Sequence, residues 1–258
     1  MAEKLKDHYN TEYAEFLGRK IRTVYADFPE KQFTAYIKQN INGKEFIERQ
    51  DVFADALELT LPPEYPEAVR IFSGILGPEL ETETGMFSDG WWLWPVGRYV
   101  ERHGIQDIPV SLAFIKELTK RFTGEFALRP LLAQKPKQIL RTVQKWSKDK
   151  NVHVRRLSSE CLRIRLPWAK KIYIFADEFE TCREILSNLR HDKSRFVQKS
   201  VGNNINDLYK EFPEKAEAIV EEWRSDNPSE ATLWIINHGL RSTRKKQTGS
   251  AAQTHKEF

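Results

Sequence analysis

Three segments of the sequence place one carboxylate among residues that are otherwise apolar or basic. They read RFTGEFALRP, NVHVRRLSSECLRIRLPWA and FVQKSVGNNINDL, and their acids are Glu125, Glu160 and Asp207. Glu160 is the sharpest case, because no second acid and four arginines lie within five residues of it: Arg155, Arg156, Arg163 and Arg165. Such an acid either relieves repulsion between the arginines or faces a positively charged substrate or transition state.

Other familiar catalytic arrangements are missing. No GxxxxGK[ST] or GxGxxG motif follows a strand, and there is no HExxH or GxSxG motif. The six histidines are scattered, and Cys161 and Cys182 have neither the spacing of a metal site nor that of a disulfide framework. We therefore expect no metal, no cofactor and a reducing, cytoplasmic environment.

The net charge of +4 conceals a division along the chain. Residues 1–110 contain 12 Lys and Arg against 19 Asp and Glu, whereas residues 111–258 contain 29 against 18. This asymmetry suggests that the basic portion faces a polyanion, although basic surfaces also occur without such a ligand. The apolar runs are too short to cross a bilayer and residues 1–10 lack the apolar core of a secretory signal, so we expect no membrane partner.

The elements that must position these residues are predicted to be helices. Apolar residues recur at helical spacing, and strand patterns are nearly absent. Pro66, Pro136 and Pro213 stand where helices at 67–76, 137–146 and 214–224 should begin. Residues 78–91 predict one long loop. A cluster of Trp91, Trp92 and Trp94 follows it, and we assign the cluster to the N-terminal core rather than to a stacking platform.

The C-terminal half repeats at intervals of 43 and 34 residues. Asp149, Asp192 and Asp226 each follow an apolar anchor by three residues and precede a small or branched apolar residue by five. A helix, a tight turn with the Asp and a second helix are typical of HEAT-like arrays, although a helical bundle with chance similarity remains possible.

We therefore predict an all-α fold, a HEAT-like (ARM-type) helical-repeat solenoid with a concave basic face built from the second helices. Residues 1–110 form its N-terminal helical portion, and residues 111–242 form the repeat portion of the same continuous solenoid and carry the site. Residues 243–258 are polar and predict a disordered tail.

These segments resemble the AlkC branch of the AlkC/AlkD-type bacterial DNA alkylation-repair glycosylases. The resemblance rests on T-x-E-F-A-[IL]-R-P (Thr123–Pro130), on the long block at Asn151–Ala169 and on N-N-x-N-D (Asn203–Asp207). It continues in W-x-x-x-H-x-L-R (Trp234–Arg241) and, more loosely, at Trp94–Gly104. It implies hydrolysis of the N-glycosidic bond of cationic N3-alkylated bases, chiefly 3-methyladenine and 3-methylcytosine, in double-stranded DNA during base excision repair. It also implies that the damaged base is not flipped out.

The resemblance implies that Glu125, Glu160 and Asp207 lie together in the cleft, with Trp168 facing the lesion. A base that already carries a positive charge leaves as a neutral molecule, so carboxylates need only stabilise the oxocarbenium-like sugar and aim a water at it. We choose Asp207 for the water and Glu160 and Glu125 for the cation. Trp168 would stack on the deoxyribose or, alternatively, cap a core. Six residues are candidate DNA contacts: Arg155, Arg156, Arg163, Arg165, Lys199 and Arg241.

The chain departs from the family pattern in two places. Some members append an immunoglobulin-like domain, whereas we expect this chain to grip DNA with its helical repeats alone, aided by residues 244–246. Cys161 and Ile164 replace a Gly and a Pro that are frequent in the family, which predicts a slight shift of Trp168.

Two other function classes stay open. A non-catalytic HEAT-repeat protein would bind damaged or branched DNA without releasing a base, and a protein–protein scaffold would bind DNA weakly and without salt dependence. The three acids and Trp168 favour the glycosylase. We expect a monomer that is associated with the bacterial nucleoid.

Overall fold

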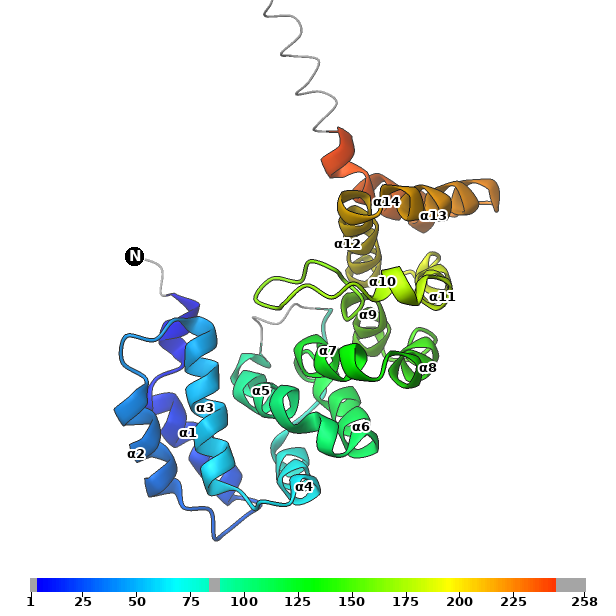
Figure 1. Ribbon diagram of the computed structural model, residues 1–258. Coiled ribbons are helices and arrows are strands. Elements are labelled where there is room, and N and C mark those ends of the chain that lie inside the picture. Colours follow the sequence, from blue (N-terminus) through cyan, green and yellow to red (C-terminus); the bar gives the residue numbers. More distant parts are fainter. Residues whose placement is uncertain (1–3, 84–88, 245–258) are drawn as a thin grey trace, which may run out of the picture. The chain divides into compact units, whose positions relative to one another are not determined.

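The computed structural model describes residues 4–83 and 89–244, and every regular element in these ranges is a helix (Figure 1). The all-α helical-repeat prediction is confirmed. None of the described helices is long and apolar enough to span a membrane. Packing divides the chain into two compact units, Met1–Leu131 and Leu132–Phe258, which we call unit 1 and unit 2. The charge division after residue 110 reflects composition and lies inside unit 1.

Unit 1 is built around buried aromatic side chains. Tyr9, Tyr13, Phe33, Phe53 and Phe72 are almost completely buried. Helices α1, α2 and α3 pack in succession, and α3 also packs against α5. The elements are η1 (Leu5–His8), α1 (Thr11–Arg22), α2 (Glu30–Asn40), α3 (Phe46–Thr60), α4 (Tyr65–Ile75), η2 (Trp91–Leu93), α5 (Trp94–His103), η3 (Gly104–Gln106) and α6 (Ile108–Thr119). Helix α7 (Glu125–Gln134) begins in unit 1 and ends in unit 2.

Local sequence signals explain where several helices begin. The Asn10 side chain accepts a hydrogen bond from the Tyr13 amide at 3.0 Å, and Asp107 accepts one from the Val110 amide at the same distance. Both are N-caps, which satisfy backbone donors that the first helical turn leaves free. Prolines occupy the first turns of five helices, and three of these prolines are the predicted ones: Pro66, Pro136 and Pro213.

Unit 2 contains three consecutive helix pairs that correspond to the three predicted repeats. The pairs are α8 (Pro136–Trp146) with α9 (Val152–Glu160), α11 (Phe179–Leu189) with α12 (Arg195–Glu211), and α13 (Pro213–Ser225) with α14 (Glu230–Gly239). A short helix, α10 (Ile174–Asp177), precedes the second pair. Residues 241–244 are helical, and the rest of the predicted tail lies outside the described residues.

The repeated aspartates stabilise the turns and join neighbouring repeats. Asp149 accepts a hydrogen bond from the Asn151 amide at 2.8 Å, and Asp192 accepts one from the Ser194 amide at 2.9 Å. Asp192 also binds Arg155 of the preceding repeat at 2.6 Å. In the same way, Asp226 of the third repeat binds Arg190 of the second. Each of these two pairs fixes one repeat against the next.

Helix α12 packs against both α9 and α14, and two glycines allow the closest approach. A Cβ atom on Gly239 would lie 2.5 Å from Ile205 Cγ2, and one on Gly202 would lie 2.8 Å from His238 Cδ2. Any larger residue at either position would force α12 and α14 apart. The close packing brings the Asn206 side-chain amide to the Gly239 carbonyl at 2.8 Å.

Candidate active site

Helices α9 and α12 bring Glu160 and Asp207 onto one guanidinium. Glu160 ends α9, Asp207 lies on α12, and Arg163 follows α9 in the next loop. Arg163 Nη1 donates to Glu160 Oε1 at 3.0 Å, and its Nε donates to Asp207 Oδ2 at 3.1 Å. Nη2 donates to the Arg165 carbonyl at 3.0 Å. Since the Arg163 side chain is only 12% exposed, it serves as a shared internal counter-charge for both acids.

Glu160 is a buried carboxylate with donors on both oxygens. Besides Arg163, Arg156 Nη2 lies 3.4 Å from Oε1, and Ser200 Oγ donates to Oε2 at 2.6 Å. Burial by itself would raise the pKa of Glu160. The two guanidinium charges and the Ser200 hydrogen bond outweigh it, so that the pKa lies below its ordinary value. Glu160 is therefore ionised and held in place at neutral pH.

A buried hydrogen-bond chain supports Ser200. Asn204 Nδ2 donates to Ser159 Oγ at 2.9 Å and to the Ser159 carbonyl at 2.8 Å, and the hydroxyls of Ser159 and Ser200 are 3.0 Å apart. An ionised carboxylate only accepts, so the Ser200 proton points to Glu160 and the Ser159 proton to Ser200. The sequence analysis assigned neither serine a role, although Ser159 lies inside the Asn151–Ala169 block and Ser200 inside the segment that carries Asp207. Asn204 likewise lies inside the N-N-x-N-D motif.

Asp207 differs from Glu160 in having one oxygen open. The residue is almost fully buried, and its hydrogen bonds from the described residues both end on Oδ2: Arg163 Nε at 3.1 Å and the Arg165 amide at 3.3 Å. Oδ1 is therefore the atom of this pair that is able to accept a hydrogen bond from a water or a substrate.

Glu125 belongs to unit 1. It begins α7 in unit 1, it is completely buried, and it accepts a hydrogen bond from Thr123 Oγ1. The structure thus brings together Glu160 and Asp207 in unit 2. The grouping of Glu125 with them stays a prediction.

Trp168 lies in the loop between α9 and α10, and 48% of its surface is exposed. About half of the side chain is therefore covered and half is accessible, and both the stacking role and the core-capping alternative stay predictions. Its φ of 59° is in the left-handed region, which bulky residues rarely adopt. The substituted positions before it, Cys161 and Ile164, are both fully buried.

Most of the predicted DNA contacts have partners within the protein. Arg155 binds Asp192, Arg156 lies 5.0 Å from the ring centre of Phe196 as well as beside Glu160, and Arg165 binds Glu211 at 2.6 Å. Arg163 is placed between the acids as described above. These contacts give the four arginines a structural role, and their contact with phosphates stays a prediction.

Lys199 and Arg241 lie close to His238. Arg241 donates to the His238 carbonyl at 2.6 Å and to Asn203 Oδ1 at 2.9 Å, and His238 Nε2 is 3.1 Å from the same oxygen. Burial, followed by the charges of Arg241 and Lys199, lowers the pKa of His238 to about 4, so the ring is neutral at physiological pH. Lys199 is exposed on α12.

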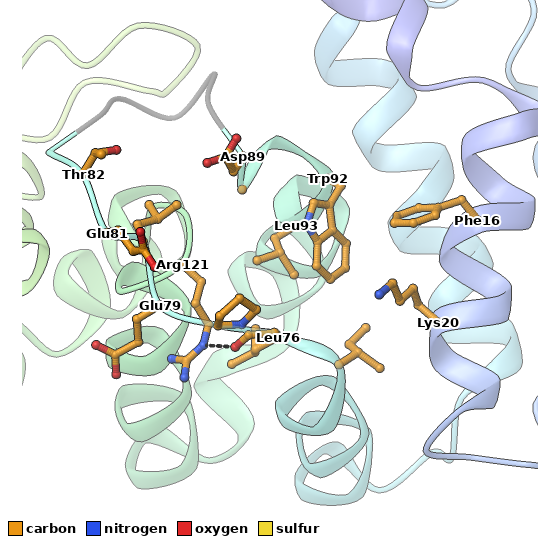
Figure 2. Close-up of a pocket in the computed structure, with 15 residues that line it drawn as sticks. Phe16, Lys20, Leu76, Glu79, Glu81, Thr82, Asp89, Trp92, Leu93 and Arg121 are labelled. Atoms are coloured by element: carbon orange, nitrogen blue, oxygen red, sulfur yellow. Dashed lines mark hydrogen bonds between the residues drawn. The ribbon is translucent and has the colours of Figure 1, made fainter.

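The prediction that the tryptophan cluster belongs to the core holds for Trp94 and only in part for Trp91 and Trp92, which are partly exposed. Trp94 is buried, and Trp91 packs against Tyr9 with 5.5 Å between ring centres. Trp92 is half-buried and lines a pocket of about 430 Å³ together with Phe16, as Figure 2 shows. The edge of one ring meets the face of the other, with centres 5.7 Å apart, and the Lys20 ammonium lies 5.9 Å from the Trp92 ring.

Among the residues that the structure describes, no group of three or more His, Cys, Asp or Glu side chains is arranged to hold a metal ion. Residues 123–242, which include Glu125, Glu160 and Asp207, match the family described as DNA alkylation repair enzyme. This segment, slightly under half of the chain, is thus similar to that family.

Two relatives match nearly the whole chain. The uncharacterized protein YhaZ of Bacillus subtilis is 34% identical over 247 residues, which are 94% of this chain and 65% of YhaZ. The alkylpurine DNA glycosylase AlkC of Pseudomonas fluorescens, solved bound to DNA containing an abasic site analogue, has a TM-score of 0.83 at 31% identity. That match covers 95% of this chain and 66% of AlkC, so the chain spans about two thirds of both relatives.

A third similarity concerns the fold alone. AlkD2 of Streptococcus mutans is 18% identical, with a TM-score of 0.52 over 82% of this chain and 97% of AlkD2. The resemblance to the AlkC/AlkD-type proteins, and to the AlkC branch in particular, is confirmed.

Proposed function

We propose that the protein is a DNA glycosylase that releases cationic N3-alkylated bases, 3-methyladenine and 3-methylcytosine, from double-stranded DNA in base excision repair. The observation that carries the proposal is the buried arrangement of Glu160, Arg163 and Asp207 inside the segment that matches the repair family. The similarity to AlkC, an alkylpurine DNA glycosylase, supports it.

Glu160 and Asp207 have different roles in the proposed reaction. Both oxygens of Glu160 are occupied by donors, so it acts as a fixed negative charge, whereas Asp207 has Oδ1 open to hold the attacking water. The bond between C1′ and the base nitrogen breaks, and its electron pair neutralises the cationic base. The water oxygen then bonds to C1′, and its proton passes to Asp207 Oδ1 and on to solvent. No general acid is needed, because the cationic base leaves as a neutral molecule without taking up a proton.

The distance from a carboxylate oxygen to the sugar cation determines how strongly each acid stabilises that cation. Arg156 and Arg163 balance the charges of Glu160 and Asp207, so the site as a whole is close to neutral. Attraction for the sugar cation must therefore come from the oxygen that faces it, and we assign that part to Asp207 Oδ1. One unit charge about 4 Å away at an effective dielectric of ~20 contributes ~4 kcal/mol, or about three orders of magnitude in rate. Glu125 would add to this charge.

The remaining site residues bind the DNA. The exposed ring of Trp168 is placed to stack on a deoxyribose, without requiring that the base be flipped out. Lys199, exposed on α12, is the strongest candidate for a phosphate contact. Arg155, Arg156, Arg163 and Arg165 would contribute mainly by shaping the surface, since protein acids already bind them.

The test is to identify, by chromatography, the bases that the purified protein releases from methylated duplex DNA. We expect 3-methyladenine and 3-methylcytosine, and we expect the Glu160→Gln variant to lose base release while it still binds DNA. Glu221→Gln, an exposed change on α13 of the same unit, is the matched control and should stay active. If the unaltered protein binds branched DNA and releases no base, the non-catalytic alternative is correct.

A further inference from the structure

We propose that Glu211, the last residue of α12, is a positioning residue that holds Trp168 in its exposed place. The proposal rests on the proposed function, because it takes Trp168 to face the substrate. Glu211 was not among the acids that the sequence singled out. It lies one helical turn after Asp207 on the same face of α12.

The Glu211 carboxylate bridges the two ends of the loop that carries Trp168. This loop is the yellow-green segment between α9 and α10 in Figure 1. Arg165, three residues before Trp168, donates to Glu211 Oε1 through Nε at 2.7 Å and through Nη2 at 2.6 Å. Lys171, three residues after Trp168, reaches the same oxygen at 3.0 Å. One carboxylate oxygen therefore binds both flanks of the loop.

The backbone at Trp168 needs such support. The Ala169 amide donates to the Leu166 carbonyl at 3.2 Å, which makes a turn with Pro167 in its second position and Trp168 in its third. With proline second and a positive φ third, this is the arrangement in which glycine is preferred third. A strained conformation of a bulky residue persists only where surrounding contacts hold it. Half of the Trp168 surface is exposed, so burial of its ring supplies only part of the restraint.

Helix α12 and the residue that follows it, Phe212, supply further contacts to the same loop. The Arg165 amide donates to Asp207 Oδ2 at 3.3 Å, and the Tyr173 ring meets the Phe212 ring edge-on with centres 6.2 Å apart. An isolated exposed ion pair contributes little to stability. Here two cations share one carboxylate whose side chain is 15% exposed, so the effect of Glu211 is on the position of the loop more than on the stability of the fold.

A double-mutant cycle tests this role. Base release from methylated duplex DNA is measured for the unaltered protein, Glu211→Gln, Trp168→Ala and the double variant, with Glu221→Gln as the control that removes an exposed carboxylate elsewhere in unit 2. We expect Glu211→Gln to lower kcat/KM by about 10- to 100-fold, as misplacement of a group by ~1 Å does. In the Trp168→Ala background it should cause no further loss, because it acts through Trp168.

Amide hydrogen exchange gives a second readout that does not depend on activity. In Glu211→Gln the amides of Ala169 and Arg165 should exchange faster than in the unaltered protein, while Glu221→Gln leaves them unchanged. The proposal is overturned if the two activity losses multiply in the double variant, or if exchange at Ala169 does not change. If the unaltered protein releases no base, the proposed function fails, and the exchange rates still decide whether Glu211 holds the loop.

Discussion

The two units differ in what fills most of their cores, although unit 1 also buries Glu125 and Arg129. In unit 1 the rings of Tyr9, Tyr13 and Phe53 pack edge to face, with centres 5.0 to 6.5 Å apart, and their burial stabilises the fold directly. In unit 2 the helix pair α9 and α12 buries two carboxylates with a guanidinium, two serines and an asparagine. A buried polar group lowers the stability of a fold unless it is hydrogen-bonded. A buried polar network of this kind is therefore better explained by a functional site than by a contribution to stability.

The tryptophans show the same contrast at the scale of one residue. Trp94 is buried in unit 1, whereas Trp168 in unit 2 is half-exposed on a backbone that favours glycine. Large aromatic residues usually pack in the core, so an exposed one in a strained turn is evidence of function. The comparison predicts that changes at Asp207 and Trp168 alter activity and that changes among the aromatic rings of unit 1 alter stability alone. Glu125, buried in unit 1, is the exception that the proposed function makes.

The largest effect is expected at Asp207. Replacement by Asn keeps the shape but removes the charge that holds the water, so kcat for base release should fall about 10³-fold, which corresponds to ~4 kcal/mol. Single-turnover assays on methylated duplex DNA measure this loss, and anisotropy with the same DNA should show unchanged binding. A fall of less than tenfold would mean that another group holds the water.

Arg163→Met tests whether the shared guanidinium is structural. Removing it leaves Glu160 and Asp207 buried beside each other, so the free energy of unfolding at pH 7 should fall by about 3 kcal/mol. Urea titration measures the change. The loss should shrink as the pH falls, because a protonated Glu160 no longer needs a counter-charge. An equal loss at pH 7 and at low pH would show that the side chain contributes by packing alone.

Ser200→Ala weakens the support of Glu160 by one charge-assisted hydrogen bond, which contributes about 2 kcal/mol. The pKa of Glu160 is lowered in the folded protein, so its contribution to stability is present above the unfolded pKa and is lost as the pH falls through the folded one. The variant should therefore be less stable at pH 7 and should start to lose stability at a higher pH. Urea titrations between pH 3 and 7 measure both effects.

Ser158→Ala is the matched control for that experiment. Ser158 is also buried on α9, but its hydroxyl donates to the Arg155 carbonyl at 2.7 Å and not to an acid. Its loss should cost about 1 kcal/mol at every pH. If both serine variants show the same pH profile, the hydroxyl chain does not influence Glu160.

Trp168 allows a test in which function and stability separate. Trp168→Gly and Trp168→Ala should both release bases more slowly, yet the glycine variant should be the more stable by about 1 kcal/mol, since only glycine adopts a positive φ without strain. This reverses the usual order of the two residues. Thermal unfolding of the two proteins side by side measures the difference, and a more stable alanine variant would contradict strain at this turn.

The smallest effect should come from unit 1. The buried Tyr13 hydroxyl donates to the Trp92 carbonyl at 2.5 Å, and Tyr13→Phe should lower the free energy of unfolding by about 1 kcal/mol. Base release should not change. A loss of activity in this variant would contradict the prediction that the aromatic core of unit 1 affects stability alone.

Much of the fold could be predicted from the sequence. Proline positions marked the starts of α4, α8 and α13, and the spacing of Asp149, Asp192 and Asp226 predicted three helix pairs, because these signals act over a few residues. The sequence also pointed to Glu160 and Asp207, which the structure joins through Arg163.

The rest depends on contacts between residues far apart in the chain. Arg155 and Arg163 read as phosphate contacts, because nothing nearby in sequence shows that Asp192 and Asp207 lie beside them. Ser200 reaches Glu160 across 40 residues, and Glu211 reaches the Trp168 loop across a similar span. The residues next to Ser200 and Glu211 in the sequence do not predict these contacts, because the partners lie far away in the chain.

The arginine–aspartate pairs between repeats show which part of a repeat junction is constant and which part varies. Asp192 binds Arg155 of the repeat before it, and Asp226 binds Arg190. The two aspartates occupy the same place in their repeats, three residues after the apolar anchor. Their arginines do not, because Arg155 lies on the second helix of its repeat and Arg190 ends the first helix of its own. A shared aspartate therefore lets each junction take its cation from a different helix, so the junctions can diverge in sequence while each keeps an ion pair.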